Sequence, residues 1–196
     1  MGIPVLIMGK SGSGKSTSLR NFKDNIGVIN VLGKPLPFRN TLPCIKTDDY
    51  TEVMKTLVGS KADSIVIDDA GYLMTNQFMR GHAKSGAGNA IFSFYNDIGD
   101  SFWNLIQFII HKLSDKKIVY LLIHEEQSDF GAIKPKSIGK MLDEKVCIEG
   151  MFTIVLRAMK NNGEYVFRTQ SDGLDVSKTP MGMFADEQIS NDLKMV

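Results

Sequence analysis

The sequence has 196 residues, of which 43% are apolar and 23% are charged, and its formal net charge is +1. This length fits a single domain, residues 1–196, with enough apolar side chains for a sizeable core. The near-neutral charge excludes a protein that attracts nucleic acid through a basic field over its whole surface, so any such surface has to be a local patch.

The two cysteines, Cys44 and Cys147, are too few for a disulfide framework and lack the close spacing of a zinc motif. We expect both to be buried, reduced thiols. No signal peptide is visible, and apolar runs such as residues 118–123 are too short to cross a bilayer. These features predict a soluble cytoplasmic protein without membrane contact.

Short apolar runs predict strands that alternate with helical segments along the chain. The predicted strands are residues 3–8, 27–31, 42–46, 64–67, 117–123, 152–156 and 164–169. The predicted helices are residues 16–22, 49–57 (capped by Asp48) and 91–113. Several strands are continuously apolar, which is typical of strands buried on both faces of a parallel sheet. The alternation predicts an α/β fold with a mostly parallel sheet flanked by helices.

Two segments fit neither pattern and are expected to be long surface loops. Residues 80–89 are rich in glycine and small side chains, and residues 127–143 carry several lysines around aromatic and aliphatic residues. Ordered loops of this length are uncommon unless they have a function.

The strongest motif is a glycine-rich loop, residues 9–16, which reads GKSGSGKS and matches G-x-x-x-x-G-K-[ST]. An apolar strand precedes it, and a helix-compatible segment follows. The glycines let the main chain bend tightly and point its N–H groups at phosphates, while Lys15 reaches the β and γ oxygens and Ser16 offers a hydroxyl to Mg²⁺. The predicted nucleotide-binding residues are Gly9, Lys10, Ser11, Gly12, Ser13, Gly14, Lys15, Ser16 and Thr17.

Polar residues end two other predicted strands. Asp68 and Asp69 follow residues 64–67, and His124 and Glu125 follow residues 117–123. Asp68 is predicted to hold Mg²⁺. Asp69 could orient the attacking water, although a helix N-cap would explain it equally well. Ligands of open parallel sheets lie beyond the carboxyl ends of the strands, so His124 could sense the γ-phosphate and Glu125 could polarise water. A polar strand end leading into a solvated loop is the alternative for both.

These segments together resemble the small phage-encoded AAA-type ATPases that keep only a RecA-like core and are associated with single-strand annealing and recombination. The resemblance rests on GKSGSGKSTSLRNF (9–22), INVLGKPLPFR (29–39), TDDY (47–50), SIVIDDA (64–70), LLIHEE (121–126) and FRTQSDGLDVSKTPMGMF (167–184). It implies a P-loop NTPase fold of RecA-like type, with ATP and Mg²⁺ as cofactors, in the cytoplasm of a bacterial host.

The resemblance also implies DNA-facing loops at the positions of the two long segments. Their cations and one aromatic side chain have the composition of a groove for single-stranded DNA. The DNA-binding candidates are Arg80, Lys84, Phe130, Lys134, Lys136 and Lys140. Further expected partners are other copies of the chain and a phage single-strand binding protein.

Three functions remain open at this point. The first is a DNA-dependent ATPase for strand annealing or recombination, with Lys15, Asp69, His124 and Glu125 as the predicted catalytic residues. The second is a nucleotide-gated binding module with negligible hydrolysis. This alternative is considered because residues 27–31, expected beside the P-loop strand, end without the glutamate that RecA proteins use there. The third is a small-molecule kinase on the same core.

Overall fold

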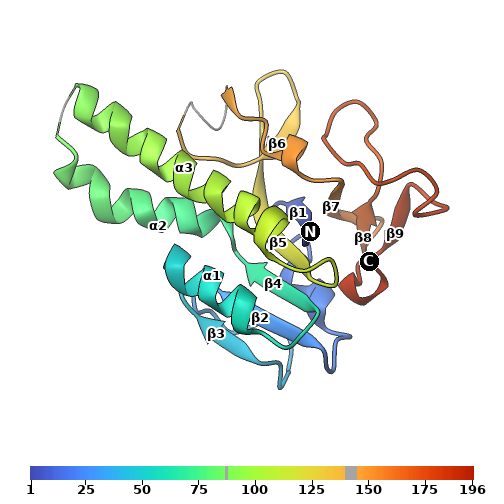
Figure 1. Ribbon diagram of the computed structural model, residues 1–196. Helices are drawn as coiled ribbons and strands as arrows, with labels where there is room; N and C mark the ends of the chain where they lie inside the picture. The colour runs from blue at the N-terminus through green and yellow to red at the C-terminus, as the bar shows by residue number, and fades with distance from the viewer. Residues whose placement is uncertain (87, 140–144) are drawn as a thin grey trace.

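The computed structural model describes residues 1–86, 88–139 and 145–196. Its strands form one nine-stranded sheet in the order β3-β2-β4-β5-β1-β7-β8-β9, with β6 paired to β5 (Figure 1). The strands are β1 (Ile3–Gly9), β2 (Ile26–Asn30), β3 (Cys44–Lys46), β4 (Ser64–Asp68), β5 (Ile118–Gln127), β6 (Ile133–Pro135), β7 (Ile154–Asn161), β8 (Glu164–Arg168) and β9 (Gln188–Ser190).

The centre of the sheet is parallel, because β3, β2, β4, β5, β1 and β7 all run in one direction. Strands β8 and β9 extend it antiparallel, through a turn in which Asn162 (φ 49°) and Gly163 (φ 90°) adopt the left-handed conformation of a tight hairpin. The expected α/β fold with a mostly parallel sheet is confirmed.

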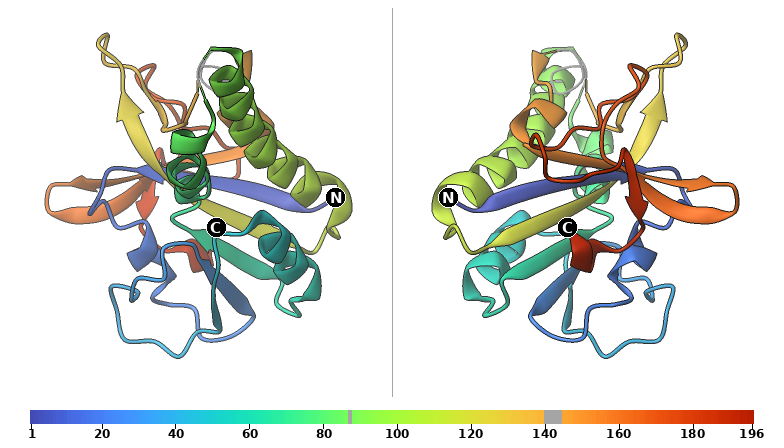
Figure 2. Two further views of the ribbon diagram at one scale, coloured as in Figure 1. Left: turned by 90° about the vertical axis from the view of Figure 1, so that its left-hand side faces the viewer. Right: turned by 90° about the vertical axis from the view of Figure 1, so that its right-hand side faces the viewer.

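The two faces of the sheet are covered differently (Figures 1 and 2). Helices α1 (Tyr50–Gly59), α2 (Gly71–Gly81) and α3 (Asn89–Lys112) pack on one face, against alternate strand residues such as Leu6 and Leu121. The opposite face, with Val5 and Tyr120, is covered by the short 3₁₀ helices η1 (Ser16–Leu19) and η5 (Leu193–Met195) and by irregular chain. Burial on both faces explains why these strands are continuously apolar.

Several expected elements differ in the structure. The helix expected at residues 16–22 is only η1, where the Ser18 hydroxyl donates to the Lys15 carbonyl (2.5 Å) and competes with helical main-chain bonding. Helix α1 is capped by Asp49, whose carboxylate accepts from Glu52 N–H (2.9 Å), and not by Asp48.

Both long loops are also more structured than expected. Arg80 belongs to the last turn of α2, and Lys84 ends the 3₁₀ helix η2 (His82–Lys84). Strand β5 continues to Gln127 and forms an antiparallel hairpin with β6, which projects away from the main sheet (Figure 2). A further 3₁₀ helix, η4 (Glu149–Met151), precedes β7.

The strand at residues 27–31 was expected beside the P-loop strand, and this is wrong. Strand β2 pairs with β3 and β4, so β4 and β5 separate it from β1. The expected burial of the cysteines is also wrong, because Cys44 on β3 and Cys147 are both exposed. No helix among the described residues has both the length and the apolar character needed to cross a membrane.

Candidate functional site

Three strand ends meet at one edge of the sheet and carry the predicted site. In the parallel register, Gly9 at the end of β1 lies beside His124 on β5. Ile67 of β4 lies beside Leu121 on the other side of β5, so Asp68 and Asp69 follow at the same edge. The glycine-rich loop, the histidine and the two carboxylates are therefore neighbours because β5 lies between β1 and β4.

The glycine-rich loop has a conformation that requires its glycines. Gly12 (φ 76°) and Gly14 (φ 93°) are in the left-handed region, and a Cβ on Gly14 would lie 2.9 Å from the Tyr165 ring. A main chain in which such residues alternate with right-handed ones forms a concavity of N–H groups that binds anions. The N–H groups of Gly12, Gly14 and Lys15 donate to no partner among the described residues.

Lys15 is folded back over this loop. Its ammonium group donates to the carbonyls of Gly9 (2.8 Å) and Lys10 (2.9 Å), and the residue is only 6% exposed. Burial lowers the pKa of Lys15 to about 8, although the carboxylates of Asp69, Asp68 and Glu125 oppose the shift. Among the described residues its ammonium group hydrogen-bonds only to neutral carbonyls, whereas the carboxylates act on it without a hydrogen bond.

Ser16 and Asp68, the two residues predicted to hold Mg²⁺, are in direct contact. The Ser16 hydroxyl donates to Oδ1 of Asp68 at 2.7 Å, although the two residues lie 52 positions apart. Burial raises the pKa of Asp68, and the hydrogen bond from Ser16 opposes this. The described residues contain no group of three or more His, Cys, Asp or Glu side chains that would hold a metal alone. A hydroxyl and one carboxylate fit Mg²⁺, which takes its other ligands from phosphates and water.

Asp69 does not cap a helix, so that alternative for its role is wrong. Helix α2 begins at Gly71 without a side-chain cap, and Asp69 itself has a left-handed backbone (φ 58°). Its carboxylate contacts Lys34 Nζ at 2.6 Å and lies 3.6 Å from Nε2 of His124. Burial alone would raise the pKa of Asp69, but the neighbouring His124 and Lys34 side chains outweigh burial and lower it. Asp69 is therefore ionised at neutral pH.

Glu125 lies beside the other predicted catalytic residues but has a different partner. Arg157 of β7 binds its carboxylate through two hydrogen bonds, Nε–Oε2 at 2.8 Å and Nη2–Oε1 at 3.0 Å. Asp175 extends the cluster, with Oδ2 3.5 Å from Nη1 of Arg157. The carboxylates of Glu125 and Asp175 are 2% and 0% exposed. This geometry favours a structural role for Glu125.

A cavity of about 410 Å³ opens beside the glycine-rich loop, between β5, the start of α2 and the chain after β6. Ser11, Lys34, Tyr72, His124 and Lys136 are among the residues that line it. His124 is oriented here by an edge-on contact with Tyr72, with ring centroids 5.9 Å apart, and its carbonyl accepts from Lys136 N–H (2.8 Å).

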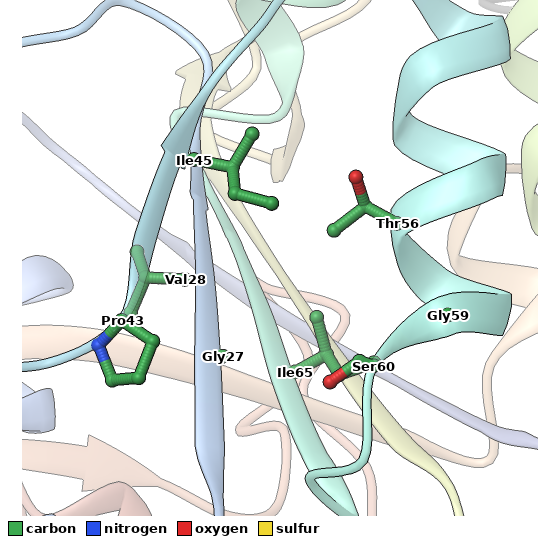
Figure 3. A pocket seen from close by; sticks show the side chains of 8 residues that line it. All are labelled: Gly27, Val28, Pro43, Ile45, Thr56, Gly59, Ser60 and Ile65. Carbon is green, nitrogen blue, oxygen red and sulfur yellow. The ribbon is translucent and has the colours of Figure 1, made fainter.

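A second cavity, of about 310 Å³, lies between helix α1 and strands β2, β3 and β4 (Figure 3). Its walls are mainly apolar, with Ile45 and Ile65 from the strands toward Thr56 and Ser60 at the end of α1, and no charged side chain of the described residues lines it. Since it lacks groups that could bind phosphate or move a proton, the cavity beside the glycine-rich loop is the candidate site.

The predicted DNA-binding residues divide between two elements. Arg80 at the end of α2 is paired with Asp48 (2.8 Å), and Lys84 in η2 is exposed. On the β5–β6 hairpin, the Phe130 side chain is 97% exposed at the turn, and Lys134 lies 3.6 Å from Glu126.

The remaining two predicted DNA-binding residues are Lys136 and Lys140. Lys136 lines the candidate cavity and does not lie at the turn of the hairpin. Lys140 lies outside the described residues.

Sequence reasoning missed Lys34, and it offered Arg157 only by default, with Arg80 and Arg168, as a candidate arginine finger. Lys34 follows a glycine and precedes a proline in a segment that reads as an ordinary loop, and Arg157 is one polar residue inside an apolar strand. Neither pattern carries a local signal, because both residues find their partners on other strands. A scan against protein-family models and a search of curated proteins gave no match for this chain.

Proposed function

We propose that the protein is a Mg²⁺-dependent ATPase of the RecA-like, P-loop type whose activity is linked to single-stranded DNA. The observation that carries the proposal is the 2.7 Å hydrogen bond between Ser16 and Asp68, directly after the buried Lys15. Phosphate cradle, hydroxyl and strand-end carboxylate are the combination that Mg²⁺-nucleotide sites require. The resemblance to phage RecA-like ATPases supports the same assignment.

In this proposal the loop N–H groups and Lys15 bind the phosphates, and Ser16 and Asp68 hold the metal. Mg²⁺, when bound, supplies positive charge to the β and γ oxygens. Asp69 accepts a proton from the attacking water. The water oxygen bonds to the γ phosphorus while the bond from that phosphorus to the bridging oxygen breaks, and the electron pair leaves with ADP. His124, 3.6 Å from Asp69, is a hydrogen-bond donor to the γ-phosphate oxygens.

The β5–β6 hairpin is the proposed DNA contact. Phe130 offers an exposed ring for base stacking, and Lys134 supplies positive charge on the neighbouring strand. The hairpin is continuous with the site, because β5 carries His124 in its second half and the N–H of Lys136, after β6, donates to the His124 carbonyl. DNA bound at the turn would therefore contact the same strand that carries His124, which lines the proposed nucleotide cavity.

Phosphate release from ATP, with and without single-stranded DNA, tests the proposal. We expect Mg²⁺-dependent turnover that DNA stimulates and that Lys15→Ala abolishes. Lys116→Ala is the matched control, since Lys116 is exposed just before β5, at the opposite end of the strand from His124. Nucleotide binding without turnover would instead support the nucleotide-gated module, and phosphate transfer to a small acceptor would support the kinase. Absence of nucleotide binding would overturn all three.

A further inference from the structure

The main chain at Lys34 is held by a turn beside the acidic strand end. Asn30, buried at the end of β2, accepts from Gly33 N–H (2.7 Å) and donates to the Lys34 carbonyl (2.5 Å). Gly33 has a left-handed φ of 68° that closes this turn. Because Asn30 lies beside Asp68 in the β2–β4 register, the turn brings Lys34 to the neighbouring Asp69.

The contact between Lys34 and Asp69 is asymmetric. The ammonium and the carboxylate are 2.6 Å apart, but the Lys34 side chain is 58% exposed whereas that of Asp69 is 7% exposed. The contact that its ammonium group makes with the Asp69 carboxylate is the main reason that the pKa of Lys34 is raised, so Lys34 is charged at neutral pH. A lysine on a flexible stem can leave this carboxylate without being buried or neutralised.

Lys34 also separates Asp69 from the cavity. Both partners of the Asp69 carboxylate, Lys34 and His124, line the cavity, whereas Asp69 is not among its lining residues. In the ligand-free protein, a water in the cavity would therefore meet the lysine and the imidazole before it could reach Asp69. Access to this carboxylate depends on where the Lys34 ammonium lies.

The charges at the strand ends make Lys34 responsive to an added anion. Lys15 and Lys34 together balance Asp68 and Asp69 when no ligand is bound. A terminal phosphate beside Ser11, on the wall of the same cavity as Lys34, would add negative charge within reach of this lysine. A phosphate offers three oxygens to the ammonium group where Asp69 offers one, and the exposed stem of Lys34 lets it exchange partners.

We propose that Lys34 is the cation, supplied by the same chain, that recognises the γ-phosphate, and that its transfer from Asp69 to this phosphate uncovers Asp69 for the attacking water. This role of Lys34 rests on the proposed nucleotide site, and it names the residue of that site that recognises the terminal phosphate. It makes Lys34 a residue that distinguishes ATP from ADP, since ADP lacks the terminal phosphate and leaves the Lys34–Asp69 pair in place. It also supplies within one chain the charge that related enzymes take from an arginine finger.

Binding measurements on Lys34→Met test this without turnover. We expect the affinity for a non-hydrolysable ATP analogue with Mg²⁺ to fall roughly 10- to 100-fold, as for loss of a charge-assisted hydrogen bond, while the affinity for ADP changes less than about threefold. Lys34→Arg should retain most of the preference. Lys46→Met is the matched control: Lys46 is exposed on β3, close to Gly33, but does not line the cavity.

A second readout uses the wild-type protein and is independent of how the variants fold. The ¹³C resonance of the Asp69 carboxyl group should shift on addition of the ATP analogue, as Lys34 leaves, and should stay near its ligand-free position with ADP. In ligand-free Lys34→Met, the pKa of Asp69 should rise because one of the two neighbouring side chains that lower it is lost.

The outcomes separate the two proposals. If the wild type binds both nucleotides but Lys34→Met keeps the preference for ATP, or the Asp69 resonance responds equally to both nucleotides, the role of Lys34 is refuted and the ATPase proposal stands. If the wild type binds neither nucleotide, the ATPase proposal itself fails.

Discussion

The buried cluster around Arg157 makes a quantitative prediction about stability. Arg157→Met keeps most of the aliphatic length of the side chain but leaves Glu125, 2% exposed, without the guanidinium group that binds it. Asp175, 0% exposed, then keeps only the longer contact with Arg168, whose Nη1 is 3.8 Å from its Oδ2. Removing one partner of a buried pair costs about 3–5 kcal/mol, because an uncompensated charge stays in the interior. This is a large fraction of the roughly 5–15 kcal/mol that stabilises a typical domain.

The expected effect on melting follows from the size of the chain. For domains of about 150–250 residues, 1 kcal/mol lowers the melting temperature by roughly 2–4 °C, so Arg157→Met should melt about 6–20 °C below the wild type. The control is Arg80→Met, which breaks an equally short arginine–aspartate contact at the surface, where the two side chains are 59% and 29% exposed. Surface pairs contribute about 0–1 kcal/mol, so this variant should melt within about 4 °C of the wild type.

Calorimetry or circular dichroism during heating measures both variants, and the result bears on Glu125. If Glu125 is structural, Glu125→Gln should also lower the melting temperature, and ATP turnover below the transition should be largely kept. The reasoning is refuted if Arg157→Met has the same melting temperature as the wild type while Glu125→Gln removes ATP turnover without changing the melting temperature. Glu125 would then be catalytic, with Arg157 serving only to orient it.

Three other predictions concern the loop and the hairpin. Gly14→Ala places a Cβ at φ 93°, 2.9 Å from the Tyr165 ring, and should destabilise the protein by about 1–3 kcal/mol; unchanged urea unfolding would contradict the loop geometry. In the proposed site Lys15 binds phosphate as a cation, and burial lowers its pKa to about 8, so nucleotide affinity should be high below pH 8 and fall as pH rises through this value. Lys15→Arg should flatten the affinity profile around pH 8, and a flat wild-type profile would count against this protonation. Phe130→Ala should weaken binding to single-stranded DNA roughly 5- to 150-fold, because each stacked base contributes about 1–3 kcal/mol. The control is Val58→Ala, at an exposed apolar site on α1, which should leave the DNA affinity unchanged. Equal DNA affinity of the two variants would remove the hairpin from the proposed interface.

The sequence predicted the features that depend on local order. Continuous apolar runs marked the parallel strands, because a strand buried on both faces has no polar side to show. The glycine spacing of residues 9–16 predicted a tight loop, which the left-handed Gly12 and Gly14 confirm. The acids after residues 64–67 and the histidine after residues 117–123 were expected at one edge of the sheet because parallel strands end together.

The tertiary structure alone decided which of these strand ends are neighbours. Strand β5 lies between β1 and β4, and this order brings Ser16 to Asp68 and His124 to Asp69, while it keeps β2 away from β1. The partners of Asp69 and Glu125 have no sequence signature: Lys34 lies in the turn after β2, and Arg157 lies on β7. Hydrophobic periodicity and glycine spacing are properties of a few consecutive residues, so the elements that depend on them can be predicted from the sequence. The pairing of charges across a sheet depends on strand order and register, which the long-range packing of the two apolar cores determines.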